Sequence, residues 1–150
     1  LRVAILSHPI FRGISPTLQE LNPLLQARIT HALDLYKNSI RPMLPECRVF
    51  HHTGMLPLFE LTPWCVLEYA ALDRTRAVVG LFRTADLGES SYTVRLRGLD
   101  LGRDYRVTFD NLRETIQCPG AALAQEGMRV FLPTNLTSEL LLFEEIRRSY

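Results

Sequence analysis

The 150-residue sequence has little of several features that would narrow its function at once. Its formal net charge is +1, which gives no electrostatic reason to expect nucleic acid or an anionic membrane as a partner. Lys37 is the only lysine, and the arginines are scattered through the chain rather than gathered in a block. No apolar run approaches the ~20 residues that a membrane span needs, and no charged segment followed by an apolar core marks a secretory signal. We therefore expect neither a nucleic-acid partner nor a membrane partner.

Cysteine is also scarce. Cys47, Cys65 and Cys118 are odd in number and widely spaced, so they form neither a disulfide framework nor the ligand pattern of a zinc site. We expect three reduced, mostly buried thiols. Such cysteine usage fits a cytoplasmic protein.

Carboxylates are missing from the first part of the chain, where Glu20 is the first acidic residue. A glycosidase needs two carboxyl groups roughly 5–10 Å apart across the bond that it cleaves. Glu68, Glu114 and Glu139 lie in or near predicted strands or their connections, where charged residues usually face solvent, and nothing in the sequence pairs them. The sequence therefore predicts no catalytic acid/base pair in this chain.

The residues that are present divide the chain by their periodicity. Arg2–Leu6 is a continuous apolar run, which predicts a short buried strand of a parallel sheet. After a loop rich in proline and glycine, Asn22 is a good N-cap and Pro23 suits the first turn of a helix. Arg41–Pro42 ends this helix, because proline disfavours a helical residue before it. Its apolar stripe consists of Leu25, Ile29, Leu33 (or Ala32), Tyr36 and Ile40. Residues 1–43 thus form one strand–loop–helix unit.

From residue 44 onward the apolar residues recur with a period of two. Between Tyr92 and Arg97, apolar and polar side chains alternate, which predicts one buried and one solvent-facing side, as antiparallel sheets allow. Seven short strands with turn residues between them indicate a small antiparallel β-sandwich over residues 44–150. These strands are expected at 48–51, 64–70, 76–83, 91–97, 105–109, 128–132 and 138–143.

Few residues are candidates for chemistry. His51 and His52 are neighbours on a predicted strand and must point to opposite faces, so we expect one packed and one exposed imidazole rather than a metal site. His8 follows the first predicted strand and would face substrate if that strand ends at the mouth of a parallel barrel; packing within its loop is the alternative. Phe11 is a candidate for stacking on a sugar ring. Trp64 is interpreted as a core anchor, with an exposed carbohydrate platform as the alternative.

Taken in order, several stretches resemble the C-terminal end of a family 36 (clan D) α-galactosidase, or melibiase. In that family a Tyr-Lys pair lies in the final barrel helix, and Tyr36 and Lys37 match it; Arg41–Pro42 matches the family's helix end. A GLDP…YRV-type turn is matched by Gly98 to Asp100 and by Tyr105 to Val107, although Leu101 replaces the proline. The matching stretches are RVAILSHPIFRGIS, LLQARITHALDLYKNSIRPML, WCVLEYAALDRTRAVVGLFR, YTVRLRGLDLGRDYRVTFDN and LTSELLLFE.

The resemblance implies an α+β fragment, in which residues 1–43 are the last βα unit of a (β/α)8 barrel and residues 44–150 are an antiparallel β-sandwich. It implies that the parent is a retaining hydrolase of terminal α-galactosides in oligosaccharides, in which one aspartate attacks the anomeric carbon and the other protonates the leaving oxygen. No position here matches those aspartates, so we expect the fragment alone to be inactive. No metal or organic cofactor is implied, galactosides would bind through the missing barrel, and oligomerisation is left open.

Two other interpretations stay open. One is a non-catalytic carbohydrate-binding module, which would need a row of exposed aromatic side chains on one sheet face; the other is the tail of a barrel glycosidase with another sugar specificity. LRGLDLGRDYRVTFD (96–110) is predicted to be a hairpin of an accessory domain that closes the barrel's end. A truncated barrel further predicts that the apolar stripe of the helix is partly exposed in this chain.

Overall fold

The computed structural model describes residues 2–6, 9, 22–54 and 62–147, and its chain divides into two compact units, 1–45 and 46–150. The first unit contains α1 (Arg2–Ile5) and α2 (Pro23–Leu35), and α2 continues as a π-helical turn to Ile40. The Asn22 side chain accepts a hydrogen bond of 2.9 Å from the Leu24 amide, so the predicted N-cap of α2 is confirmed.

The strand predicted at Arg2–Leu6 is wrong, because Arg2–Ile5 is helical. Periodicity alone does not distinguish a short apolar run in a strand from one in a helix. A parallel strand needs neighbouring strands to pair with its backbone groups, whereas a helical turn forms without them. No parallel strand pair occurs among the described residues.

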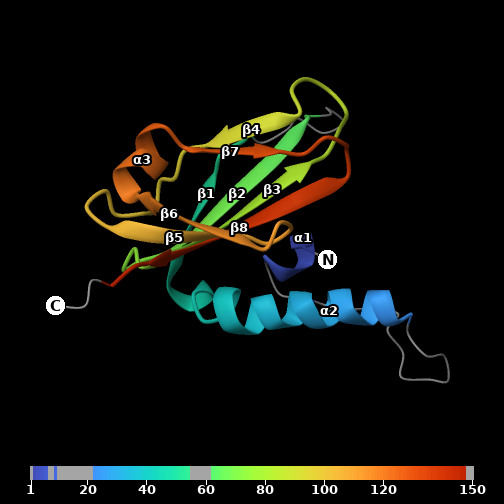
Figure 1. Ribbon diagram of the computed structural model, residues 1–150, viewed down its shortest axis with the longest axis horizontal. Helices are drawn as coiled ribbons and strands as arrows, with labels where there is room; N and C mark the ends of the chain where they lie inside the picture. Colours follow the sequence, from blue (N-terminus) through green and yellow to red (C-terminus); the bar gives the residue numbers. More distant parts are fainter. Residues whose placement is uncertain (1, 7–8, 10–21, 55–61, 148–150) are drawn as a thin grey trace. The chain divides into compact units, whose positions relative to one another are not determined.

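The second unit is an antiparallel two-sheet domain, and its predicted class is confirmed. The large sheet has the order β1-β2-β3-β8-β5-β6, and β4 and β7 form a separate pair (Figure 1). The strands are β1 (Cys47–His51), β2 (Trp64–Ala71), β3 (Arg76–Arg83), β4 (Ser91–Val94), β5 (Asp104–Phe109), β6 (Glu114–Pro119), β7 (Met128–Phe131) and β8 (Thr137–Glu145), with a short helix α3 (Gly120–Gln125) before β7 and a 3-10 turn (Leu44–Glu46) before β1. The sequence did not predict β6 or α3.

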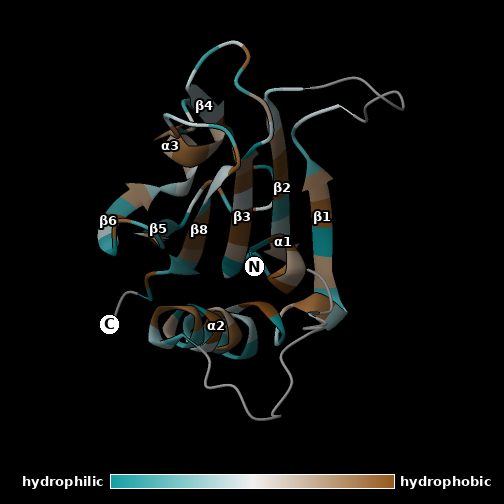
Figure 2. Ribbon diagram, turned by 90° about the vertical axis from the view of Figure 1, so that its right-hand side faces the viewer, coloured by the Kyte–Doolittle hydropathy of each residue, from teal (hydrophilic) through white to brown (hydrophobic). Residues whose placement is uncertain are grey.

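The hydrophobic core lies between the large sheet and the layer formed by β4, β7 and α3. Side chains from both layers belong to it, including Val79 of β3, Val94 of β4 and Leu123 of α3. β2 alternates buried and half-buried positions as its sequence predicts. β3 is buried at every position after Arg76, so it needs apolar cover on both faces. Figure 2 accordingly shows β3 coloured as hydrophobic along most of its length.

The hairpin predicted at 96–110 is wrong. β4 ends at Val94 and pairs with β7, whereas β5 pairs with β6 and β8 in the large sheet. Beyond Val94 the backbone leaves its strand, because the Leu96 amide donates to the Leu123 carbonyl and the next two amides donate to a side chain of β2. Residues 95–103, here called the crossing segment, therefore connect β4 of the small sheet to β5 of the large sheet. The alternation from Tyr92 to Arg97 is nevertheless confirmed, with Leu96 buried and Arg97 exposed.

Candidate functional site

The candidate site residues predicted from the sequence, His8 and Phe11, lie outside the described residues. His51 is exposed, whereas the His52 side chain is only 5% exposed, so the prediction of one packed and one exposed imidazole is confirmed. Among the described residues, no group of three or more His, Cys, Asp or Glu side chains could hold a metal ion. Within the same residues, no helix is long and apolar enough to span a bilayer.

The polar centre of the domain is Glu68, which is fully buried on β2. Its Oε1 accepts a hydrogen bond of 2.7 Å from the Gly98 amide, and its Oε2 accepts one of 3.0 Å from the Arg97 amide. Oε2 also lies 2.7 Å from His52 Nε2, just beyond the end of β1. One carboxylate thus connects β2, the end of β1 and the crossing segment.

The expectation that Glu68 and Glu139 face solvent is wrong, since they are 0% and 3% exposed. Burying a carboxylate is costly unless hydrogen bonds satisfy it. Glu139 Oε1 accepts from the amides of Asn111 and Leu140, each at 2.9 Å. Glu114, by contrast, is exposed as predicted. The signal for Glu68 was in the sequence: it has the same parity on β2 as the core residues Trp64, Val66 and Ala70.

These two buried carboxylates do not form a glycosidase pair. Glu68 on β2 is opposite Val79 of β3, and Glu139 on β8 is opposite Leu81 of β3. The two glutamates therefore lie on either side of β3 and are offset by two residues along it. On an ideal sheet that offset separates their Cα atoms by about 12 Å. Both carboxylates are also enclosed and occupied by backbone amides, so neither is presented to a substrate.

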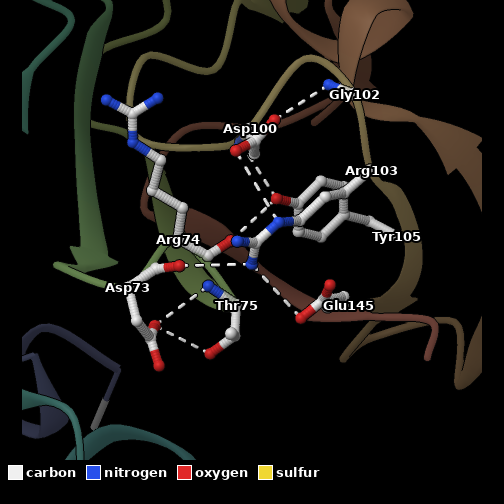
Figure 3. Close-up of polar contacts among 8 residues, drawn as sticks. All are labelled: Asp73, Arg74, Thr75, Asp100, Gly102, Arg103, Tyr105 and Glu145. Carbon is white, nitrogen blue, oxygen red and sulfur yellow. Dashed lines mark hydrogen bonds and ion pairs between the residues drawn. The ribbon is translucent and has the colours of Figure 1, made fainter.

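A second polar cluster, centred on Tyr105 of β5, holds the crossing segment in place (Figure 3). The Tyr105 side chain is fully buried, and its hydroxyl accepts a hydrogen bond of 2.9 Å from the Asp100 amide and donates one of 2.7 Å to the Arg74 carbonyl. Burial is the main cause that raises the pKa of Tyr105. The arrangement resembles the tyrosine corners of other β-sandwiches, in which a hydroxyl bonds to backbone a few residues upstream.

Charged side chains close the outer side of this corner. Asp100 Oδ1 accepts from the Gly102 amide at 2.9 Å, and its Oδ2 lies 3.6 Å from the Arg103 guanidinium. Arg103 also reaches Glu145 at 3.3 Å and the Asp73 carbonyl at 3.2 Å (Figure 3). The Asp73 carboxylate accepts from the amide and hydroxyl of Thr75, which hold its pKa below the ordinary value. The GLD and YRV residues therefore have a structural role.

Close backbone packing explains two glycines of the cluster. A Cβ at Gly98 would lie 2.1 Å from the Ala70 Cβ, and a Cβ at Gly120 would lie 2.0 Å from the Asp100 carbonyl oxygen. Both distances are far below a van der Waals contact. The crossing segment can reach the sheet and α3 only because these positions lack a side chain.

Trp64 is a core residue, as predicted. It is 5% exposed, its indole N–H donates to the Glu89 carbonyl at 3.1 Å, and its ring lies 5.6 Å from that of Tyr92. A buried ring cannot form a carbohydrate platform.

Cys47, Cys65 and Cys118 are half-buried, more exposed than expected. Burial raises the pKa of the thiols of Cys47, Cys65 and Cys118. A raised thiol pKa keeps each sulfur protonated at neutral pH and lowers its reactivity.

The fold and these contacts define the second unit as a two-sheet antiparallel β domain whose loops are held by buried polar groups. The chain belongs to glycosyl hydrolase family 36: the profile of the "Glycosyl hydrolase family 36 C-terminal domain" matches residues 64–143. The resemblance to this family is thereby confirmed. No curated protein matches the sequence.

Solved structures of similar fold are α-galactosidases. The enzyme from Lactobacillus brevis matches with a TM-score of 0.70 at 13% identity, over 87% of this chain and 18% of that one. AgaA from Geobacillus stearothermophilus matches with a TM-score of 0.66 at 20% identity, over 85% of this chain and 17% of that one. The galactosidase domain of the α-galactosidase–sucrose kinase AgaSK matches with a TM-score of 0.65 at 19% identity, over 84% and 17%. The chain therefore spans less than a fifth of the length of these enzymes.

Proposed function

We propose that this chain is the C-terminal part of a retaining glycoside hydrolase that releases terminal α-galactosyl groups from oligosaccharides. The observation that carries the proposal is the family match over 64–143, supported by the common fold with three α-galactosidases. In such an enzyme one carboxylate attacks the anomeric carbon and a second protonates the leaving oxygen. We assign neither group to this chain, so its contribution is to support the catalytic domain.

The second face of the large sheet supports this role. Val78, Phe82 and Leu140 alternate with the core residues of β3 and β8, so their side chains point away from the core, and yet they are at most 8% exposed. Leu67 and Tyr69 of β2 extend the same face, because in register they are opposite Gly80 and Val78. Val78, Phe82 and Leu140 are already covered within this chain, so the apolar area left for a partner is the half-buried part of the face at Leu67 and Tyr69. We propose that this part of the face packs against the catalytic domain of the parent.

We assign residues 1–43 to the end of the catalytic domain and residues 44–150 to the supporting domain. The exposure of α2 supports this division: Leu25 is 44% exposed, and Ile29, Leu33 and Tyr36 are half-buried. The predicted partial exposure of this stripe is confirmed. Neighbouring helices of a complete barrel would cover it.

We further propose that His8 and Phe11 contact the galactoside, because they lie in the stretch RVAILSHPIFRGIS, which resembles the end of the family's catalytic domain. The odd number and wide spacing of the cysteines support a cytoplasmic location for the parent, since disulfide frameworks are rare in reducing compartments.

The test compares hydrolysis of a chromogenic α-galactoside by this chain and by the complete gene product. We expect activity in the complete product alone, with the α-anomer of galactose released first, as a retaining mechanism requires. Matched β-galactoside and α-glucoside substrates serve as controls. Activity in this chain would show that it contains a catalytic pair, and hydrolysis of only a control substrate would overturn the sugar specificity.

The same assay tests the substrate contacts. In the complete product, His8→Ala and Phe11→Ala should raise KM for the α-galactoside. The control is Arg129→Ala on β7, where the arginine is exposed and, within the described residues, its side chain hydrogen-bonds to the Ser91 hydroxyl alone. An unchanged KM in both variants would overturn the assignment of His8 and Phe11 while leaving the proposed reaction in place.

A further inference from the structure

A small hollow at one edge of the second unit is lined by three arginines: Arg48 of β1, Arg74 of the turn between β2 and β3, and Arg97 of the crossing segment. Gly98 lies against Ala70 at its floor, and Phe50 and Leu72 contribute apolar walls. None of these residues takes part in the function proposed above.

The guanidinium groups of this hollow make few hydrogen bonds or ion pairs with the described residues. Within residues 22–54 and 62–147, those of Arg48 and Arg74 have no hydrogen-bond or ion-pair partner, and that of Arg97 makes one contact of 3.4 Å with the His51 carbonyl. Figure 3 shows the Arg74 side chain pointing away from the polar cluster around Tyr105, which engages only its backbone carbonyl. The charges of the hollow are therefore available to a ligand.

The nearest buried carboxylate does not neutralise them through a contact. Glu68 lies beneath the hollow, and a Cβ at Gly98 would be 3.0 Å from its Oε1. Its oxygens are already occupied by the amides of Arg97 and Gly98 and by His52. One negative charge under three positive ones leaves the hollow cationic.

Size and chemistry limit what can bind. The hollow encloses about 70 Å³, well below the ~300 Å³ at which pockets for drug-sized ligands begin, so it has room for a single compact group rather than a sugar chain. Guanidinium groups donate paired hydrogen bonds to phosphate and carboxylate oxygens, and several converging ones favour a multiply charged anion.

From this geometry we propose that Arg48, Arg74 and Arg97 form a binding site for a phosphate group, either as inorganic phosphate or as a phosphate monoester on a sugar. This proposal does not depend on the function proposed above.

The test is an NMR titration of the 15N-labelled 150-residue chain with inorganic phosphate and, in a second arm, with glucose 6-phosphate. Sodium chloride at equal ionic strength is the reference. We expect saturable shifts of the amides of Leu72, Arg74 and Gly98 in at least one arm. Tighter binding of the sugar phosphate would assign the site to monoesters, and equal binding would assign it to the free anion.

Arginines with the same backbone conformation provide a matched pair of variants. Arg74 and Arg113 both have left-handed backbone, with φ of 61° and 56°, so glycine suits either position. Arg74→Gly should weaken binding by about tenfold or more, as expected when charge-assisted hydrogen bonds are lost. Arg113→Gly should leave binding unchanged, and Arg48→Gln, on the exposed edge strand, should weaken it without touching the turn.

Shifts that do not saturate, or that chloride reproduces, would overturn the site. So would full retention of binding in both Arg74→Gly and Arg48→Gln, or equal loss in Arg113→Gly. The spectrum of each variant shows whether it is folded, so misfolding cannot be confused with loss of the site.

Discussion

Replacing Gly98 by alanine tests the central contact of the domain. The added Cβ would lie 2.1 Å from the Ala70 Cβ, 3.0 Å from Glu68 Oε1 and 3.1 Å from Phe50 Cε2. Two carbon atoms pack at roughly 3.5–4.0 Å, so the crossing segment must retreat by about 1.5 Å. Gly98 does not have a positive φ, which makes the expected effect steric rather than conformational.

That retreat also breaks hydrogen bonds. The Gly98 amide donates to Glu68 at 2.7 Å, and a shift of this size would move it out of bonding range. Overpacking costs about 1–3 kcal/mol, and losing a hydrogen bond to a buried charge costs about 1.5–3 kcal/mol. We therefore expect Gly98→Ala to lower the free energy of unfolding by about 4 kcal/mol, a large part of the stability of an ordinary domain.

Urea unfolding followed by the fluorescence of the single tryptophan, Trp64, measures this loss. The control is Gly54→Ala, because no atom lies within 4 Å of a Cβ at that position. In the double variant Gly98→Ala/Ala70→Gly, the atom at 2.1 Å is gone and part of the loss should be recovered. If Gly98→Ala costs no more than Gly54→Ala, the packing argument is refuted.

Three further predictions concern the buried polar groups. Tyr105→Phe removes the hydroxyl that bonds to the Asp100 amide and the Arg74 carbonyl, and should lower the free energy of unfolding in urea by about 1–3 kcal/mol. A loss below about 0.5 kcal/mol would contradict the stabilising role of these two hydrogen bonds. Glu68→Gln places an amide N–H₂ where a carboxylate oxygen accepts a backbone N–H, and should cost about 1.5–3 kcal/mol, whereas an unchanged urea midpoint would count against the connecting role of Glu68. Since burial raises the pKa of Tyr105, its contribution to stability is fully present below about pH 10, where the unfolded phenol is still protonated, and is lost as the pH rises further. Stability measured between pH 9 and 11 should therefore fall less steeply in Tyr105→Phe than in the unmodified chain, and identical slopes would refute this assignment.

The sequence predicts a strand well where the alternation of apolar and polar residues follows the burial of its two faces. β2 has one face in the core and one half-buried face, so alternation located it to within one residue. The start of α2 was equally readable, because the signals at Asn22 and Pro23 act within a single turn.

Other elements depend on partners that the local sequence does not encode. β6 is exposed at almost every position, so it has no apolar alternation to detect, and its place in the sheet comes from pairing with β5. α3 has six residues, with Pro119 as its N-cap and Gly120 as its first residue, a pair that also suits a turn. The 96–110 segment has the pattern of a hairpin, but its only strand is β5; β4, which precedes it, pairs with β7, more than thirty residues away in the sequence.

The polar framework was predictable only in part. The parity of Glu68 on β2 indicates burial, but its acceptance of the Arg97 and Gly98 amides requires knowledge of where the crossing segment lies. The hollow beside it combines β1, a turn and the crossing segment, three parts of the chain brought together only by the sheet order. The separations along the chain, from Arg48 to Arg97, carry no sequence signal of this proximity.

The order of strands in the large sheet has a consequence for biosynthesis. β8, the last described strand along the chain, lies between β3 and β5, and among the described strands it alone joins β1-β2-β3 to β5-β6. On a translating ribosome the two flanking groups emerge first and must wait, with unpaired edges, until residues 137–145 are made. A premature stop codon just before residue 137 would therefore leave the sheet in two separate parts, although the strands of both parts had been translated.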